Sequence, residues 1–291
     1  MLDFSIAGIH IRILSDVEMR VIKAFEAFLL PLDEKSIPQY VVNFQAVSEL
    51  NIPKEKCIYQ EGKFLIYPAG EHSFQRAFRC DTGTKEIYAV SICEAHKNQV
   101  KVTYLDTERD SFSDVQKAFL HIGWEWILMK EGKLMLHASC VKTQFGGIVF
   151  SGPSGIGKST QAGLWCEYAD ATLINGDKTI LTKQENVWRG HGSPYAGSSG
   201  CYVNDECPVR AIVFLKQDDV CSLRKLNVTE GFKKIYTGLT INYWDSVYVE
   251  KVSNLALALA LDIPTFEFSC TPDRQAVDYL KEKIFGGEKF E

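Results

Sequence analysis

The feature that most constrains this chain is the octapeptide at 152–159, which reads GPSGIGKS and matches the pattern GxxxxGK[ST] at every fixed position. The apolar run at 147–150 before it is strand-like in its length and in its β-branched and aromatic residues. The segment 159–168 after it contains no proline and reads as a helix. A strand, a glycine loop (residues 152–157) and a helix in this order predict an α/β arrangement in which the helix N-terminus faces the ligand of the loop.

The pattern has a chemical reason. Its glycines let successive backbone N–H groups point inward around a polyphosphate, while Lys158 adds a positive charge for the β- and γ-phosphates. The hydroxyl of Ser159 is suited to bind Mg²⁺. A Gly/Ser turn that binds nothing is the alternative, although such a turn does not need Lys-Ser after its last glycine. The sequence therefore predicts a nucleotide site formed by Gly152, Pro153, Ser154, Gly155, Ile156, Gly157, Lys158, Ser159 and Thr160.

Composition excludes several classes of protein. The 291 residues suffice for one large or two ordinary domains, and 46% hydrophobic with 24% charged residues is typical of a soluble globular chain. A formal net charge of −5 without a long basic run argues against nucleic acid as a partner. The most apolar helical stretch, 255–261, is far too short to span a membrane. Nine scattered cysteines and no visible signal peptide predict reduced thiols and a cytoplasmic location.

The first part of the chain, 1–112, reads as a strand-rich lobe. Alternating or β-rich patterns predict strands, joined by turns such as the one at 81–83, in an antiparallel arrangement. An amphipathic helix is expected at 17–30, where Pro31 ends it. The predicted strands are 4–14, 41–47, 63–67, 85–92 and 99–105.

A helix at 113–130 is expected to connect this lobe to the rest of the chain, within a linking segment 113–132. Ser111 or Ser113 is the candidate N-cap, and Gly132 the exit. Trp124 and Trp126 cannot share one helical face, so we expect core packing on more than one side of this helix.

From residue 133 to 291 the pattern alternates between strands and helices, which indicates the α/β domain that contains the glycine loop. Strands are expected at 134–141, 148–150, 171–174, 179–181, 210–215 and 265–268. Helices are expected at 159–168, 229–236, 248–261 and 273–284.

Two further residues are candidates for the chemistry. Mg²⁺ needs a carboxylate besides the loop hydroxyl, and Asp177 is the nearest acid downstream. It follows the strand at 171–174, so we expect it beside Ser159; a solvated turn pair with Lys178 is the alternative. His137 lies on the strand before the loop strand. It is either a hydrogen-bonded core residue or a group that contacts phosphate or tunes a base.

A Gly/Ser segment at 190–200 is long enough to be a wall for the acceptor or for the γ-phosphate, or else a plain connector. Basic residues that are candidates to stabilise transition-state charge are Arg189, Arg210, Arg224 and Arg274, which the sequence does not rank.

The runs LHASCVKTQFGGIVFSGPSGIGKSTQAGLW, ATLINGDKTIL, GHGSPYAG and PVRAIVFLKQ together resemble the HPr kinase/phosphorylase-related family. The resemblance covers about 133–285. It implies a phosphoenolpyruvate carboxykinase/HPr kinase-like P-loop catalytic domain, α/β in class and α+β overall, with a smaller strand-rich N-terminal lobe. It also implies ATP as the nucleotide, Mg²⁺ as the metal and the ability to form homo-oligomers. Shorter relatives, including those of lasso-peptide clusters, phosphorylate a peptide.

The resemblance implies roles for single residues. His137 matches the histidine that precedes the family's loop, and Asp177 matches the second acid of an expected Asp-Asp pair. The first acid of that pair falls on Gly176, so the base is either Asp177 or His137. No signature of the family's phosphorylase activity is recognisable.

We therefore predict a kinase that transfers the γ-phosphoryl group of ATP to a Ser or Thr hydroxyl of a peptide or small protein. Lys158 and the loop amides hold the phosphates, Ser159 and Asp177 hold Mg²⁺, and Asp177 or His137 assists the acceptor. Three alternatives stay open. They are a small-molecule kinase with the same core, a non-catalytic nucleotide sensor favoured by Gly176, and an ordinary P-loop ATPase or GTPase. The last is disfavoured by the lack of an NKxD motif and of an apolar run leading directly into an aspartate.

Overall fold

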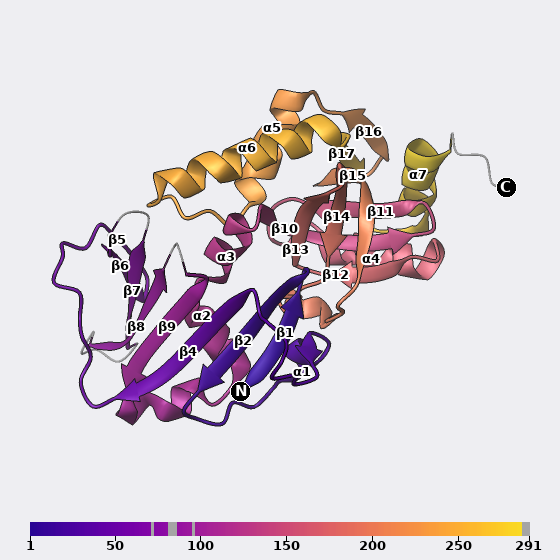
Figure 1. The fold of residues 1–291 in the computed structure, drawn as a ribbon. Coiled ribbons are helices and arrows are strands. Elements are labelled where there is room, and N and C mark those ends of the chain that lie inside the picture. Colours follow the sequence, from indigo (N-terminus) through magenta and orange to yellow (C-terminus); the bar gives the residue numbers. More distant parts are fainter. Residues whose placement is uncertain (71–72, 81–85, 95–96, 287–291) are drawn as a thin grey trace. The chain divides into compact units, whose positions relative to one another are not determined.

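The computed structural model describes residues 1–70, 73–80, 86–94 and 97–286 (Figure 1), and the turn expected at 81–83 lies outside them. The chain divides into two compact units, Met1–Trp124 and Glu125–Glu291. The boundary between them falls inside the segment 113–132.

The first unit is built on a mixed sheet of nine described strands in the order β3-β1-β2-β4-β9-β8-β7-β6-β5. The strands expected at 41–47, 63–67, 85–92 and 99–105 are confirmed as β4, β6, β8 and β9, although residue 85 lies outside the described residues. The antiparallel arrangement is wrong at two pairings, because β4 runs parallel to both β2 and β9. The strands are β1 (Leu2–Ile6), β2 (Ile9–Ser15), β3 (Leu29–Leu30), β4 (Tyr40–Val47), β5 (Tyr59–Glu61), β6 (Phe64–Pro68), β7 (Phe74–Arg79), β8 (Ile87–Glu94) and β9 (Gln99–Leu105).

The single strand predicted at 4–14 is wrong, since β1 and β2 form a hairpin. Ala7 and Gly8 have φ values of 49° and 75°, the left-handed pair that a two-residue hairpin turn requires. Ile6 and Ile9 face each other directly across this turn, and both are buried.

The helix predicted at 17–30 is also wrong, because only α1 (Lys23–Glu26) is helical. The backbone before it is engaged elsewhere: the N–H of Arg20 donates to the Ser113 carbonyl at 2.8 Å, and the Val115 N–H donates to the Arg20 carbonyl at 3.1 Å. These non-local bonds use the groups that a helix would need. After α1, the chain returns to the sheet as β3.

The helix predicted at 113–130 is interrupted, and its two parts are α2 (Val115–His121) and α3 (Trp124–Lys130). The interruption lies at Gly123, whose φ of 69° does not fit a helix. The N-cap of α2 is Asp114, which accepts from the Lys117 N–H at 2.9 Å, rather than Ser111 or Ser113. Trp124 and Trp126 are buried, as expected for core residues.

The second unit contains a sheet of eight described strands. The strands and helices expected in this part of the chain are confirmed, and β14 and β16 are additional to those ranges. The strands are β10 (Lys133–Thr143), β11 (Gly146–Ser151), β12 (Thr172–Asn175), β13 (Lys178–Gln184), β14 (Val187–His191), β15 (Glu206–Gln217), β16 (Ser222–Lys225) and β17 (Thr265–Cys270). The helices are α4 (Lys158–Tyr168), α5 (Val228–Gly238), α6 (Ser246–Asp262) and α7 (Arg274–Phe285).

Strand pairing in this unit closes on itself. β11 pairs with β10, β10 with β13, β13 with β14, β14 with β15, and β15 again with β11. Within this ring of five strands, β11 and β15 are parallel, and β17 adds a third parallel strand. The carboxyl ends of parallel strands meet at one edge, which is where α/β proteins bind ligands.

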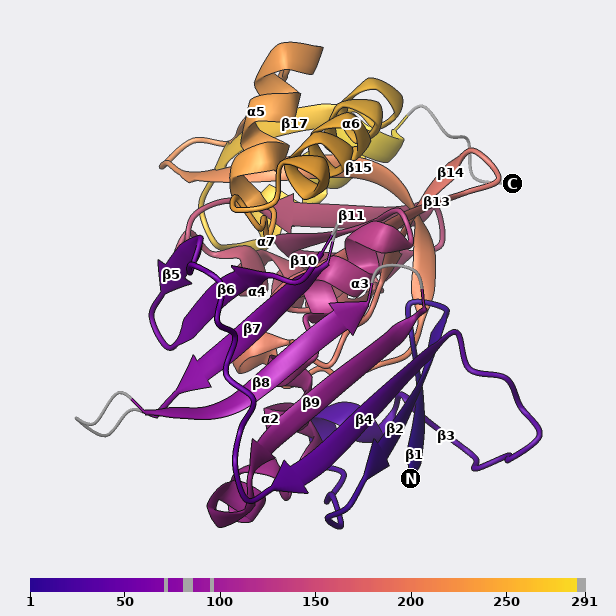
Figure 2. The ribbon, with the colours of Figure 1, turned by 60° about the vertical axis from the view of Figure 1, so that its left-hand side comes forward.

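Helices cover both faces of the parallel strands. The α4 and α7 pair shares an apolar cluster with Ile148, Phe150 and Val213. On the opposite side, α5 and α6 lie side by side (Figure 2), and Lys234 of α5 lies 5.6 Å from the ring centre of Phe214. The strand β11 is therefore buried from both sides and ends at Ser151, where the glycine loop begins.

Candidate functional site

The glycine loop connects β11 to α4 through backbone conformations that favour glycine. Gly152, Gly155 and Gly157 have φ values of 144°, 79° and 108°. Such values are strained for residues with a Cβ atom. The helix begins directly after the loop at Lys158, so its first free N–H groups lie at the loop. This local structure matches the arrangement expected for anion binding at a helix N-terminus.

Lys158 is almost fully buried, with 6% of its surface exposed. Its ammonium group donates to the carbonyl oxygens of Gly152 and Pro153, each at 3.0 Å. Burial lowers the pKa of Lys158, while the nearby Asp177 opposes that shift. The ammonium group therefore donates to neutral oxygen atoms of its own loop, and a phosphate would replace these contacts with an anion.

His137 and Asp177, which are 40 positions apart, lie together beside the loop. Nδ1 of His137 is 2.9 Å from Oδ1 of Asp177, and both side chains are about 30% exposed. The distance is short enough for a hydrogen bond, but the imidazole Nδ1 is buried and not aligned to form one. Burial first, and then the charge of Lys158, lowers the pKa of His137 below 6.5. A neutral imidazole positioned next to a carboxylate is able to accept a proton.

Asn175 fixes the turn that presents Asp177. Its side chain is fully buried, and its Oδ1 accepts from the N–H groups of Asp177 at 2.9 Å and Lys178 at 2.7 Å. Its Nδ2 donates to the Ser193 hydroxyl at 3.1 Å. Asn175 was not among the residues predicted for the site, although an asparagine two residues before the turn is the signal of an Asx-turn.

The Gly/Ser segment at 190–200 lies against this turn and explains Gly176. A Cβ atom on Gly176 would lie 2.0 Å from Oγ and 2.3 Å from Cβ of Ser199. An acid at this position does not fit while Ser199 occupies the space. The Ser159 hydroxyl donates to the Gly176 carbonyl at 3.3 Å, so the turn also contacts the start of α4.

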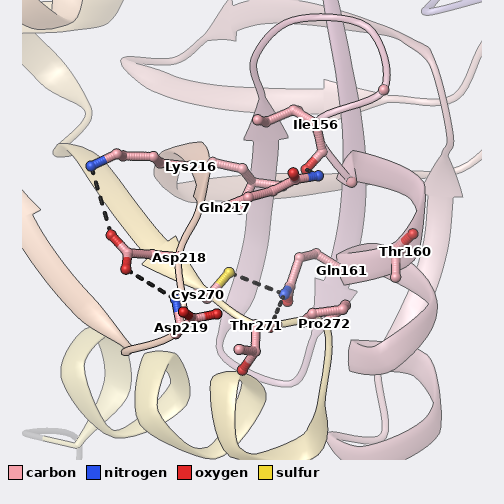
Figure 3. A pocket seen from close by; sticks show the side chains of 13 residues that line it. Ile156, Thr160, Gln161, Lys216, Gln217, Asp218, Asp219, Cys270, Thr271 and Pro272 are labelled. Carbon is pink, nitrogen blue, oxygen red and sulfur yellow. Dashed lines mark hydrogen bonds and ion pairs between the residues drawn. The ribbon is translucent and has the colours of Figure 1, made fainter.

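Two cavities adjoin the glycine loop. The first, the Gln161 cavity, has a volume of about 770 Å³ and is shown in Figure 3. Gln161 donates to the Thr271 carbonyl at 3.3 Å, and because a carbonyl can only accept, this contact orients the amide. The lining comprises Gly155, Ile156, Gly157, Thr160, Gln161 and residues at the carboxyl ends of β15 and β17 (215–219 and 270–272).

The second, the His137 cavity, has a volume of about 510 Å³. The first residues of the loop, Gly152 and Pro153, belong to it, whereas Gly155 and Gly157 belong to the Gln161 cavity. The two cavities therefore adjoin opposite ends of the loop. The lining comprises His137, Ser151, Gly152, Pro153, Lys178, Phe214, Leu215, Lys234, Thr237, Gly238 and Leu239.

None of the four arginines singled out from the sequence lines either cavity. Arg189 is paired with Glu206 at 2.8 Å, and Arg224 with Glu230 at 2.8 Å. Arg210 donates to a carbonyl oxygen at 2.7 Å, and Arg274 is 3.5 Å from a carboxylate on its own helix. The basic residues that line the His137 cavity are instead Lys178 and Lys234, and the sequence indicated Lys178 only as a turn neighbour of Asp177.

Among the described residues, no three His, Cys, Asp or Glu side chains are grouped to hold a metal ion. The predicted metal residues, Ser159 and Asp177, supply one hydroxyl and one partly exposed carboxylate. This set fits Mg²⁺ bound with a nucleotide, because Mg²⁺ takes one or two protein ligands and completes its shell with phosphate oxygens and water.

Neither a protein-family profile nor a curated protein sequence matches the chain. Among solved structures, the Hpr(Ser) kinase/phosphatase from Coxiella burnetii matches weakly, with a TM-score of 0.32 and 16% identity. That match covers 53% of this chain and 94% of the other, so the family resemblance stays a prediction. No helix in the described part of the chain is long and apolar enough to cross a lipid bilayer.

Proposed function

We propose that this protein is an ATP-dependent phosphotransferase that transfers the γ-phosphoryl group to a hydroxyl acceptor. The observation that carries the proposal is the 2.9 Å contact between His137 and Asp177 beside the glycine loop. A proton acceptor, a carboxylate and the loop lysine thus converge at one place, as a reaction between a triphosphate and a hydroxyl requires.

The loop amides and Lys158 would hold the phosphates, and Ser159 and Asp177 would hold Mg²⁺. When bound, the metal neutralises charge on the β- and γ-phosphates. His137 is the proposed base, because its lowered pKa keeps it neutral at neutral pH. Asp177 then positions the imidazole ring and stabilises it once it is protonated. This assigns separate roles to the two residues that the sequence left as alternatives.

The two cavities support one direction for the nucleotide. Thr160 and Gln161 on α4 lie on the side of the loop where the α-phosphate and the nucleoside would leave it. The His137 cavity adjoins the other end, where the γ-phosphate would meet the acceptor. A volume of about 510 Å³ is large enough to admit a Ser or Thr side chain, and the acceptor that we propose is a peptide or small protein.

Calorimetric titration of Mg-ATP tests the proposal, with phosphate release and autophosphorylation followed on the same samples. We expect Lys158→Ala to weaken binding roughly 100-fold, the size of a charge-assisted contact of about 3 kcal/mol. We expect His137→Gln to bind normally and to slow turnover roughly 100-fold. No binding of Mg-ATP to the wild type would refute the proposal.

A second function is favoured by one observation. Gly176 leaves the site with a single carboxylate where the family resemblance implies two, which suits a nucleotide sensor without turnover. Binding of Mg-ATP that Lys158→Ala abolishes, together with no phosphate release in the presence of Ser- and Thr-containing peptides, would support the sensor over the kinase.

A further inference from the structure

Lys178 carries a charge that no carboxylate among the described residues pairs with. It lines the His137 cavity, and its ammonium group donates to the hydroxyl of Thr240, 3.5 Å from Nζ. Across the described part of the chain, no carboxylate oxygen lies within 4.0 Å of this ammonium group. The other lysine of the cavity differs, because Nζ of Lys234 is 3.0 Å from the carboxylate of Glu267.

The position of Lys178 is fixed by its backbone. Its N–H donates to Oδ1 of Asn175 at 2.7 Å and to the Tyr195 carbonyl at 3.1 Å. In the register of β10 and β13, Lys178 stands directly opposite His137. The residue is therefore rigidly attached beside the base and does not depend on a mobile loop for its place.

The charge of Lys178 lies inside the site. Lys178 lines the same cavity as His137 and the loop residues Gly152 and Pro153. A cation that has no anionic partner among the described residues and borders a cavity is a place where added negative charge is stabilised.

The position of Lys178 also has a purely structural explanation, in which the lysine stabilises the end of α5. Thr240 follows the C-terminal end of α5, whose C-cap is Leu239, and Lys178 contacts Thr240. A positive charge near a helix C-terminus is stabilising by itself. On this explanation, Lys178 would support the fold and would have no effect on a bound phosphoryl group.

We propose that Lys178 is a catalytic residue that binds the oxygen atoms of the phosphoryl group during its transfer, an inference that rests on the proposed function. In this step the bond from the γ-phosphorus to the bridging oxygen breaks, and that oxygen leaves with ADP. A bond from the same phosphorus to the acceptor oxygen forms, and the acceptor proton passes to His137. Lys178 keeps its proton throughout and contributes charge alone, as cationic groups do for the equatorial oxygens in phosphoryl transfer.

Transition-state analogue binding tests this directly and needs no acceptor. Mg-ADP is titrated with and without aluminium fluoride, which mimics the phosphoryl group in the transition state of its transfer. We expect aluminium fluoride to tighten binding of Mg-ADP to the wild type, and Lys178→Met to lose at least tenfold of that gain. The variant's affinity for Mg-ADP alone should stay within threefold of wild type. Lys178→Arg should recover part of the gain, because it restores the charge.

Lys234→Met is the matched control, since it removes a lysine of the same cavity whose charge is already paired; it should keep the full gain. Lys178→Gln serves where Lys178→Met does not fold, because an amide can still reach Thr240. Full retention of the gain in either Lys178 variant, with a lower melting temperature, would overturn the proposal in favour of support for α5. A wild type that binds Mg-ADP without any gain would also overturn it, while leaving the nucleotide site intact. A wild type that does not bind Mg-ADP would refute the proposed function itself.

Discussion

The two units of the molecule treat buried charge differently. In the first unit, the nearly inaccessible carboxylate of Asp3 accepts two hydrogen bonds from Arg12, at 2.8 and 2.7 Å, and these hold the pKa of Asp3 below its usual value. In the second unit, the buried ammonium group of Lys158 and the half-buried one of Lys178 donate to carbonyl and hydroxyl oxygens, and neither forms an ion pair with a described residue. A buried charge needs an opposite charge to offset its lost hydration. The first unit therefore supplies a counter-charge for Asp3, whereas the second leaves room at Lys158 and Lys178 for an anion from outside.

The largest effect is expected from a carboxylate added inside the second unit. We expect Gly176→Asp to destabilise the protein by about 3 kcal/mol or more, because its side chain would collide with Ser199 and bury a charge. The restored acid should not increase turnover. Urea denaturation measures the loss of stability, and phosphate release measures turnover.

Gly163→Asp is the matched control for that variant, because nothing lies within 4 Å of a Cβ atom at Gly163. We expect it to leave stability within about 1 kcal/mol of wild type. If Gly176→Asp were as stable as Gly163→Asp and bound Mg²⁺ more tightly, the Gly/Ser segment would be adaptable and the steric account of Gly176 would be wrong.

Lowering the pH should reduce the stability of both units to a similar extent. Burial lowers the pKa of His121 in the first unit and of His191 in the second to about 4. The unfolded chain takes up a proton at each residue near pH 6.5 and the folded chain only near pH 4, so stability is lost as pH falls between these values. From pH 7 to pH 5 we expect each to contribute a loss of about 2 kcal/mol.

Substitution separates the two contributions. His121→Gln should be less stable at pH 7, since it loses its packing against Phe78, but its stability should fall less steeply towards pH 5. His191→Gln should do the same in the second unit. An unchanged slope of unfolding free energy against pH in both variants would rule out these histidines as its source.

A smaller effect is expected from Asn175→Ala, which changes only the second unit. It removes a fully buried side chain that accepts from two backbone N–H groups, so we expect a loss of about 2 kcal/mol. Because the turn that Asn175 fixes holds Asp177 and Lys178, turnover should fall roughly tenfold beyond any effect on folding. Urea denaturation and phosphate release at a temperature well below unfolding measure the two effects.

Asp3→Asn is its counterpart in the first unit, because it leaves Arg12 with a weaker acceptor. A similar loss of about 2 kcal/mol is expected, with the affinity for Mg-ATP unchanged. The division between the units would fail if Asp3→Asn weakened Mg-ATP binding as strongly as Asn175→Ala slows turnover.

The smallest effect is expected on the outer side of α4. Gly163→Ala should stabilise the protein by about 1 kcal/mol, since the position is exposed, helical and open. Affinity for Mg-ATP should not change, which a thermal melt and one titration would establish. Weaker nucleotide binding in this variant would mean that α4 has to bend when the loop is filled.

Much of the second unit could be predicted from the sequence, because its signals are local. The apolar run, the glycine loop and the helix follow one another directly in the sequence, so they are also neighbours in the fold. His137 and Asp177 were predicted separately, without a contact between them. Their 2.9 Å contact depends on the pairing of β10 with β13.

The predictions that were wrong concern either residues far apart in the sequence or a local pattern that has a second interpretation. The hairpin at Ala7 and Gly8 shifts the alternation of the sequence by one residue, since the buried apolar side chains are even-numbered in β1 (Phe4 and Ile6) and odd-numbered from Ile9. The missing helix at 17–30 was not readable, because the bonds of Arg20 are made with residues more than 90 positions away. The clash that excludes an acid at Gly176 likewise depends on Ser199, which only the folded chain brings near.

The closed ring of strands has a mechanical consequence for the glycine loop. The strand that leads into the loop, β11, is hydrogen-bonded along both edges, to β10 and to β15. It cannot slide or tilt without breaking two ladders at once, so whatever fills the loop must be accommodated by the loop and by side-chain rotamers. Amide protons of β11 should accordingly be among the last to exchange with deuterium, and a ligand should slow exchange in the loop while leaving the strand beneath it unchanged.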